Sequence, residues 1–146
     1  MNNEQIFREI ILSYLHQNYI WKGQNPNVGF DCSNLVVDIL KSVGEFTYNG
    51  GATPQYLFNR YRENHMSTKP QLGAICFYGK SEQRIHHCGI MLNDSMMLES
   101  GGGTSGTKSK KDAIEANARV RIRPYDYRKD LIKILVPEYE LIEVFL

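Results

Sequence analysis

The order in which helical and strand-like patterns follow one another is the feature of this sequence that most constrains its fold. Apolar residues recur at helical spacing over about residues 3–17, 32–43 and 54–63. Short apolar or alternating runs, separated by turn residues, follow at 73–79, 85–92, 96–100 and 118–123. Because helices come first and strands second, the sequence predicts an α+β fold with N-terminal helices packed on an antiparallel sheet.

The chain of 146 residues is long enough for one compact domain, so we expect residues 1–146 to form a single domain. The sequence pattern does not determine the structure of two segments. The tail at 131–146 is apolar, but it has no period that separates strand from helix. The glycine-rich segment at 101–109 is similar to a phosphate-binding loop. However, Thr107 stands between its last glycine and Lys108, so we interpret it as a loop beside the functional site.

Side-chain periodicity predicts which residues face the core. In the run at 118–123, strict alternation predicts that Val120 and Ile122 point inward. The three arginines of the same run then form a solvated face, although an anionic ligand that crosses this face could use them. These arginines are Arg119, Arg121 and Arg123. The packing residues expected of the third predicted helix are Tyr56, Leu57 and Tyr61.

Charge and composition exclude several classes of function. Lysine and arginine total 17 against 16 aspartate and glutamate, so no net charge drives binding to nucleic acid or to an anionic membrane. The first residues lack the basic and apolar segments of a signal peptide, and no apolar run reaches membrane-spanning length. Three cysteines without framework spacing indicate free thiols and synthesis in the cytoplasm. Cys76 and Cys88 lie in strand-like runs and are expected in the core.

The third cysteine, Cys32, stands where a glycine-bearing loop meets the first turn of a predicted amphipathic helix. Unpaired backbone N–H groups and the positive end of the helix dipole favour a thiolate there and lower the thiol pKa. A buried structural cysteine is the alternative at this position. The sequence therefore indicates, but does not by itself establish, a nucleophile.

A histidine in the predicted strand at 85–92 could supply the base that a nucleophilic cysteine needs. Because neighbouring strand residues point to opposite faces, His86 and His87 cannot both serve. His86 shares its face with Cys88, Ile90 and Leu92, which form the more continuous core stripe. His87 is therefore the predicted base.

The turn that follows this strand determines which residue can orient His87. A three-residue hairpin loop at 93–95 would pair Gly89 with Glu99 and place Glu99 diagonal to His87 on the same face. Gly89 would leave room between the two side chains. Glu99 could then hold the second ring nitrogen of His87 and stabilise the imidazolium, whereas a two-residue loop would turn Glu99 away.

Four motifs occur in order between Tyr19 and Ile122. They are Tyr-Ile-Trp at 19–21, Asp-Cys-Ser-Asn-Leu-Val at 31–36, Gly-Ala-Ile-Cys-Phe-Tyr at 73–78 and His-Cys-Gly-Ile-Met at 87–91. Together they resemble the motifs of the NlpC-type cell-wall peptidases, papain-like cysteine hydrolases that cut peptide bonds in peptidoglycan stems. Asn34 and Ala74 stand where this family usually has glycine and aspartate, and neither change removes a catalytic group.

The resemblance implies a papain-like fold with Cys32 as nucleophile, His87 as base and Glu99 as the polar third residue. It also implies substrate-binding or oxyanion roles for four further residues, of which the first reaches over the cysteine. These are Tyr19, Trp21, Asp31 and Ser33.

The implied function is a cysteine endopeptidase that hydrolyses peptidoglycan stem peptides through an acyl-enzyme, without a cofactor or metal. A zinc site from Cys32 and residues 86–88 is disfavoured, since adjacent strand residues diverge and no Cys-x-x-Cys pair exists. The alternatives are a thiol amidase or acyltransferase on the same fold, or a non-catalytic phage structural or assembly module. The implied setting is action on the cell wall as a secreted effector, or with a phage tail or lysis machinery.

Overall fold

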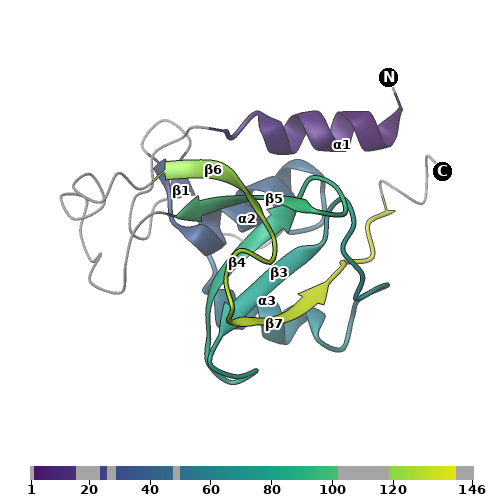
Figure 1. Cartoon of the computed structure of the whole chain (residues 1–146). Coiled ribbons are helices and arrows are strands. Elements are labelled where there is room, and N and C mark those ends of the chain that lie inside the picture. The colour runs from purple at the N-terminus through teal and green to yellow at the C-terminus, as the bar shows by residue number, and fades with distance from the viewer. Residues whose placement is uncertain (1, 16–23, 26–28, 48–49, 102–118, 141–146) are drawn as a thin grey trace.

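The computed structural model describes residues 2–15, 24–25, 29–47, 50–101 and 119–140. Its helices are α1 (Asn3–Leu12), α2 (Cys32–Ser42) and α3 (Pro54–Tyr61). Its strands are β1 (Gln24–Asn25), β2 (Gly29–Phe30), β3 (Ile75–Gly79), β4 (Ile85–Met91), β5 (Met96–Gly101), β6 (Arg119–Pro124) and β7 (Leu131–Leu135). An antiparallel sheet has the order β6-β5-β4-β3-β7, and β1 pairs with β2 (Figure 1). The predicted α+β fold is confirmed.

Side-chain caps determine where the helices begin. The Asp31 backbone is extended, and its carboxylate accepts a hydrogen bond from the Asn34 N–H at 2.8 Å, so α2 begins at Cys32. Thr53 caps α3 in the same way, with Pro54 in the first turn. Gly44 follows α2 with a φ of 80°, the left-handed conformation that commonly ends a helix.

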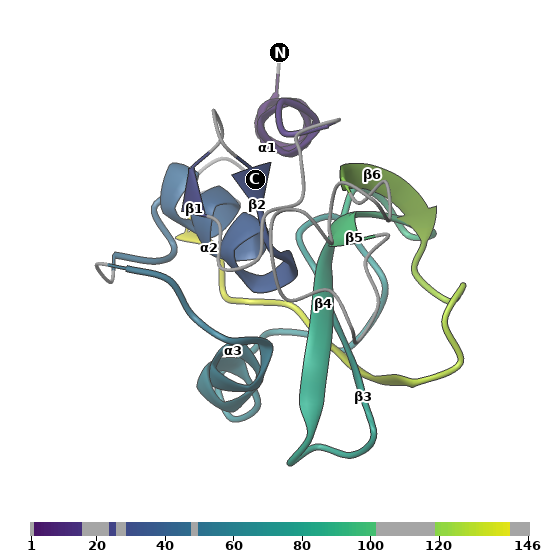
Figure 2. The same ribbon diagram turned by 90° about the vertical axis from the view of Figure 1, so that its left-hand side faces the viewer.

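The helix α2 is the centre of the core. Its apolar residues Leu35, Val36, Ile39 and Leu40 are fully buried, and the helix packs against β4 and β5. Figure 2 shows α2 and α3 on one side of β3 and β4, as expected for helices packed on a sheet. This packing presents the N-terminal end of α2, and therefore Cys32, to the sheet. No helix in the described parts of the chain is long and apolar enough to cross a membrane.

Several local predictions were wrong. The helix α1 ends at Leu12 and α3 at Tyr61, each earlier than expected. Tyr56 is 44% exposed, because Leu57, Phe58 and Tyr61 fill the inner face of α3. Ile122 is 37% exposed, because β6 lies at the edge of the sheet and, among the described strands, pairs with β5 alone. The open question at 131–146 is answered in part, since residues 131–135 form β7.

Candidate active site

Cys32 is the first residue of α2 and is half-buried. Its position depends on the Asp31 cap, and Asn34 supports this cap from within the helix. The Asn34 side chain donates to Asp31 Oδ2 at 3.1 Å and accepts a hydrogen bond from the Ala52 N–H at 3.1 Å. Asn34 thus ties the start of α2 to the segment before α3, which gives a physical role to a residue where the NlpC-type family usually has glycine.

His87 and Glu99 form a buried pair on neighbouring strands. Ile90 pairs with Leu98 and Met91 with Met97, so the hairpin loop has the three residues that were predicted. The Nε2 atom of His87 lies 2.6 Å from Oε2 of Glu99, and their side chains are 9% and 0% exposed. This leaves the other ring nitrogen, Nδ1, for Cys32.

Gly89 creates the space in which these two side chains meet. A Cβ atom there would lie 2.7 Å from Met97 Sδ and 3.4 Å from Glu99 Cβ. A larger residue would therefore push against β5, which carries Glu99. The predicted room at Gly89 is confirmed.

His86 was expected in the core stripe, and this expectation was wrong. Its side chain is 49% exposed and its Nε2 atom lies 3.8 Å from Asp130 Oδ2. Cys88, Ile90 and Leu92 are buried as predicted. The stripe therefore begins at Cys88. His87 is buried and His86 is exposed, so the core position expected of His86, on which the choice of His87 rested, is not found.

The electrostatics of the site favour charged forms of all three groups. Burial opposes protonation of His87, but hydrogen bonds with Cys32 and Glu99 outweigh it and raise the His87 pKa from 6.5 to about 9. Burial raises the pKa of Glu99, while the contacts with His87 and Tyr127 lower it overall. The pKa of Cys32 lies well below its usual value, first because of the Cys88 thiol and then because of His87. The site therefore suits a Cys32 thiolate, a His87 imidazolium and a Glu99 carboxylate, with the imidazolium between the two anions.

Cys88 contacts Cys32, and the sequence did not indicate this contact. It is fully buried, and its sulfur lies 3.8 Å from the Cys32 carbonyl oxygen. Burial and the neighbouring Cys32 raise the pKa of Cys88 well above its usual value, so it remains a thiol. The protonated thiol donates to the Cys32 carbonyl oxygen, and its presence beside Cys32 lowers the Cys32 pKa. Cys88 lies in the core as predicted, and it also borders the site.

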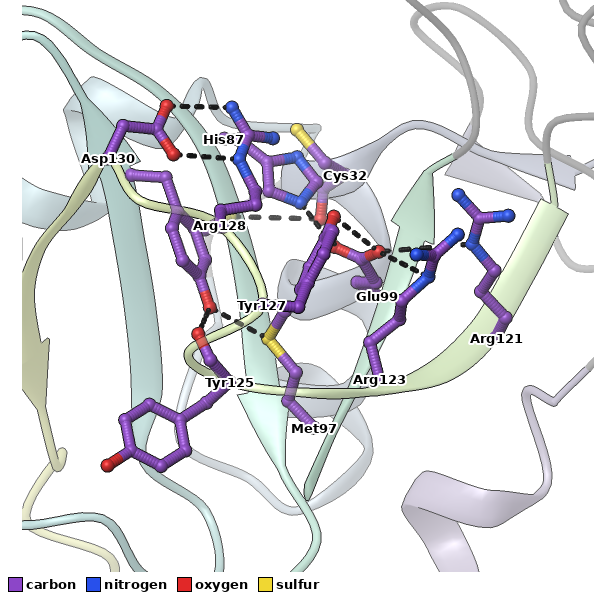
Figure 3. Close-up of polar contacts among 12 residues, drawn as sticks. Cys32, His87, Met97, Glu99, Arg121, Arg123, Tyr125, Tyr127, Arg128 and Asp130 are labelled. Carbon is purple, nitrogen blue, oxygen red and sulfur yellow. Dashed lines mark hydrogen bonds and ion pairs between the residues drawn. The ribbon is translucent and has the colours of Figure 1, made fainter. Parts of the chain in front are cut away.

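Tyr127 contacts Glu99, and the sequence did not indicate this contact either. It lies between β6 and β7, and its hydroxyl donates to Glu99 Oε1 at 2.9 Å and to Oε2 at 3.1 Å (Figure 3). Its ring is covered by the Arg123 guanidinium, whose carbon lies 4.8 Å from the ring centroid. The segment that carries Tyr127 is held by a hydrogen bond from Tyr78 to the Tyr125 carbonyl. No local sequence pattern could have linked Tyr127 to a residue 28 positions away.

The arginines of β6 do not form the solvated face that was expected. Arg121 pairs directly with Glu99 across the sheet, and its side chain is 23% exposed. Arg123 is 34% exposed on the same face. Both therefore belong to the surroundings of Glu99, because the β5–β6 register brings them there.

The remaining predicted residues have different outcomes. Tyr19 and Trp21 lie outside the described residues, as do most of the segment at 101–109 and the end of the tail. Ser33 is 3% exposed, and its hydroxyl donates to Asp31 at 3.4 Å. Asp31 caps α2 through Asn34. Among the described residues, no group of three or more His, Cys, Asp or Glu side chains is placed to hold a metal ion.

The helices, the antiparallel sheet and a cysteine at a helix start beside a strand histidine define a papain-like α+β domain. The chain belongs to the NlpC/P60 family, whose model matches residues 16–123.

Named relatives and solved structures agree with this assignment. The chain is 28% identical over 86 residues to "Probable endopeptidase YafL" of Escherichia coli K12, a match that covers 59% of this chain and 34% of that protein. It is 31% identical over 105 residues to the "Bifunctional muramidase/DL-endopeptidase CwlT" of Bacillus subtilis 168, covering 66% of this chain and 29% of that protein. The chain thus spans about a third of the length of these relatives.

Two crystal structures show the same fold at low identity. A Staphylococcus aureus NLP/P60 family protein, described as similar to lipoprotein, has a TM-score of 0.66 at 17% identity, covering 92% of this chain and 41% of that chain. The NlpC/p60 domain of the peptidoglycan hydrolase SagA has a TM-score of 0.64 at 16% identity, covering 90% of this chain and 97% of that chain.

Proposed function

We propose that this chain is a cysteine endopeptidase that hydrolyses peptide bonds in peptidoglycan stem peptides. Family membership supports this, as do relatives that are named endopeptidases and peptidoglycan hydrolases. The observation that carries the proposal is the arrangement of a low-pKa Cys32 at a helix start beside His87, whose ring is held by the buried Glu99. Such an arrangement supports the roles of nucleophile for Cys32 and of oriented base for His87.

The proposed reaction is acyl transfer in two steps. The Cys32 thiolate attacks the scissile carbonyl carbon, and the carbonyl oxygen becomes an oxyanion near backbone N–H groups of the first turn of α2, which have no acceptor within the helix. The His87 imidazolium protonates the leaving amine as the C–N bond breaks, which leaves a thioester. His87 then takes a proton from water, the hydroxide attacks the thioester, and the Cys32 thiolate departs.

Glu99 acts through His87 in this scheme. As an anion it favours the imidazolium, and its hydrogen bond to Nε2 keeps Nδ1 directed at Cys32. The substrate contacts of Tyr19 and Trp21 stay predictions, and so does any partner in a phage tail or lysis machinery.

Digestion of purified muropeptides, followed by mass spectrometry, tests the proposal. We expect the wild-type chain to produce fragments with a new amino and a new carboxyl terminus. Cys32→Ala should produce none while keeping the wild-type circular dichroism spectrum, and Cys76→Ala, which changes a buried cysteine of β3 opposite Gly89, should retain cleavage. Ammonia release or transfer of an acyl group instead of peptide cleavage would favour the amidase or acyltransferase alternative. Full cleavage by Cys32→Ala would overturn the proposed nucleophile.

A further inference from the structure

A row of charged side chains crosses three strands on one face of the sheet. His87 on β4 contacts Glu99 on β5, and Glu99 is directly opposite Arg121 on β6. Arg123 follows two residues later on the same face. Figure 3 shows the guanidinium groups of Arg121 and Arg123 turned toward Glu99, on the side opposite to Arg128 and Asp130.

Arg121 and Arg123 both lie beside the Glu99 carboxylate, which already contacts two other side chains. Glu99 accepts hydrogen bonds from Tyr127 and contacts His87 at 2.6 Å. The Nε atoms of Arg121 and Arg123 lie 3.9 Å and 3.7 Å from Glu99 Oε1, beyond hydrogen-bond distance. By contrast, Arg128 donates two hydrogen bonds to the Asp130 carboxylate, at 2.9 Å and 2.8 Å.

Arg121 in particular has unused hydrogen-bonding capacity. Its Nε atom is buried and has no hydrogen-bond partner among the described residues. A buried donor without a partner is costly, and a ligand group that accepts its hydrogen bond removes that cost. Burial and the neighbouring Arg123 also lower the Arg121 pKa, as expected where two cations lie close together.

The guanidinium groups beside Glu99 outnumber its single carboxylate. With Cys32 as thiolate and His87 as imidazolium, those two charges cancel, and Glu99 can balance only one of the two arginines. An incoming anion would balance the other. A carboxylate suits the planar fork of a guanidinium, which binds it through two parallel N–H groups.

We infer that Arg121 and Arg123 form a binding site for a carboxylate of the peptide substrate, next to the proposed catalytic residues. This inference takes its substrate class, carboxylate-bearing stem peptides, from the proposed function. The bound carboxylate lies beyond Glu99 as seen from His87, so it fixes the direction in which the peptide crosses Cys32. The arginines thereby select substrates whose carboxylates are free over those in which they are amidated.

Calorimetric binding in the Cys32→Ala background tests this site without turnover. The probes are two synthetic stem peptides that differ only in having their free carboxylates intact or converted to carboxamides. We expect amidation to weaken binding about tenfold, the scale of one charge-assisted hydrogen bond. Adding Arg121→Gln or Arg123→Gln should reduce the ratio of the two dissociation constants, amidated peptide over free carboxylate, to about one. Adding Arg84→Gln, which changes an exposed arginine just before β4, should leave the ratio unchanged.

The outcomes separate this inference from the proposed function. An unchanged ratio in both arginine variants overturns the inference, and so does an equal loss of affinity for both peptides, which would mean that the arginines only hold Glu99 in place. Cleavage of the same peptides by the wild-type chain is measured in parallel. If binding discriminates but no peptide is cut, the carboxylate site stands and the proposed function fails.

Discussion

His87 Nε2 lies 2.6 Å from Glu99 Oε2, with the carboxylate fully buried. This contact orients the His87 ring and, together with Cys32, favours its charged form. A carboxylate in the third position raises the imidazole pKa more than a neutral residue would, because it adds a full negative charge. The pair should therefore set the alkaline limit of activity.

The first prediction concerns Glu99→Gln. The His87 pKa is raised to about 9, and the active imidazolium is lost as the pH rises through that value. Since a neutral amide stabilises the imidazolium less, the alkaline limb of kcat/KM should move to lower pH. Peak activity should fall about 100-fold, the scale of impaired general acid–base catalysis.

The control for this change is Glu63→Gln, which alters a carboxylate whose side chain is 84% exposed. Its pH profile should match that of the wild-type chain. An alkaline limb that does not move in Glu99→Gln would show that Glu99 does not control the charge of His87.

The second prediction concerns Tyr127, which we expect to be a positioning residue. Tyr127→Phe removes the hydroxyl that donates to both Glu99 oxygens but keeps the ring under Arg123. Loss of one hydrogen bond to a charged group should lower kcat about tenfold with little change in KM. Tyr125→Phe, two residues away, is the matched control and should keep the wild-type kcat. Equal kinetics in both variants would remove Tyr127 from the mechanism.

The third prediction concerns the second thiol at the site. Cys88→Ala removes the donor that contributes most to lowering the Cys32 pKa. The midpoint of the pH dependence of Cys32 alkylation by iodoacetamide should therefore rise, with modification followed by mass spectrometry. The rise should be about one pH unit, since a hydrogen bond to a charged group is worth about 1.5 kcal/mol or more. Cys76→Ala changes an equally buried cysteine and should leave the midpoint where it was. A midpoint common to all three chains would contradict the proposed thiol contact.

The fourth prediction concerns Gly89. An added Cβ would meet Met97 Sδ at 2.7 Å and the Leu98 carbonyl oxygen at 3.1 Å. Gly89→Ala should lower the free energy of unfolding in urea by about 1–3 kcal/mol, the usual cost of overpacking. It should also reduce activity at temperatures where the protein remains folded, because the β5 backbone at Leu98 must give way and Glu99 is the next residue of that strand. A variant with wild-type stability and activity would show that the hairpin opens at little cost.

Local spacing in the sequence was enough to predict much of the fold and the main geometry of the site. The Asp31 cap predicts a helix that begins at Cys32, strand parity separates His87 from His86, and the length of the turn at 93–95 brings Glu99 to His87. Each of these depends on residues that are close in the chain or on one hairpin. Backbone periodicity therefore determines them without knowledge of distant contacts.

Only the tertiary structure decided what surrounds Glu99 and Cys32. Tyr127 reaches Glu99 from the segment after β6, Arg121 faces it across the β5–β6 register, and Cys88 meets the start of α2. Exposure of Ile122 likewise depends on β6 being an edge strand. These features arise from which elements lie side by side, and that arrangement follows from the packing of the whole core, because no period within a single segment records it.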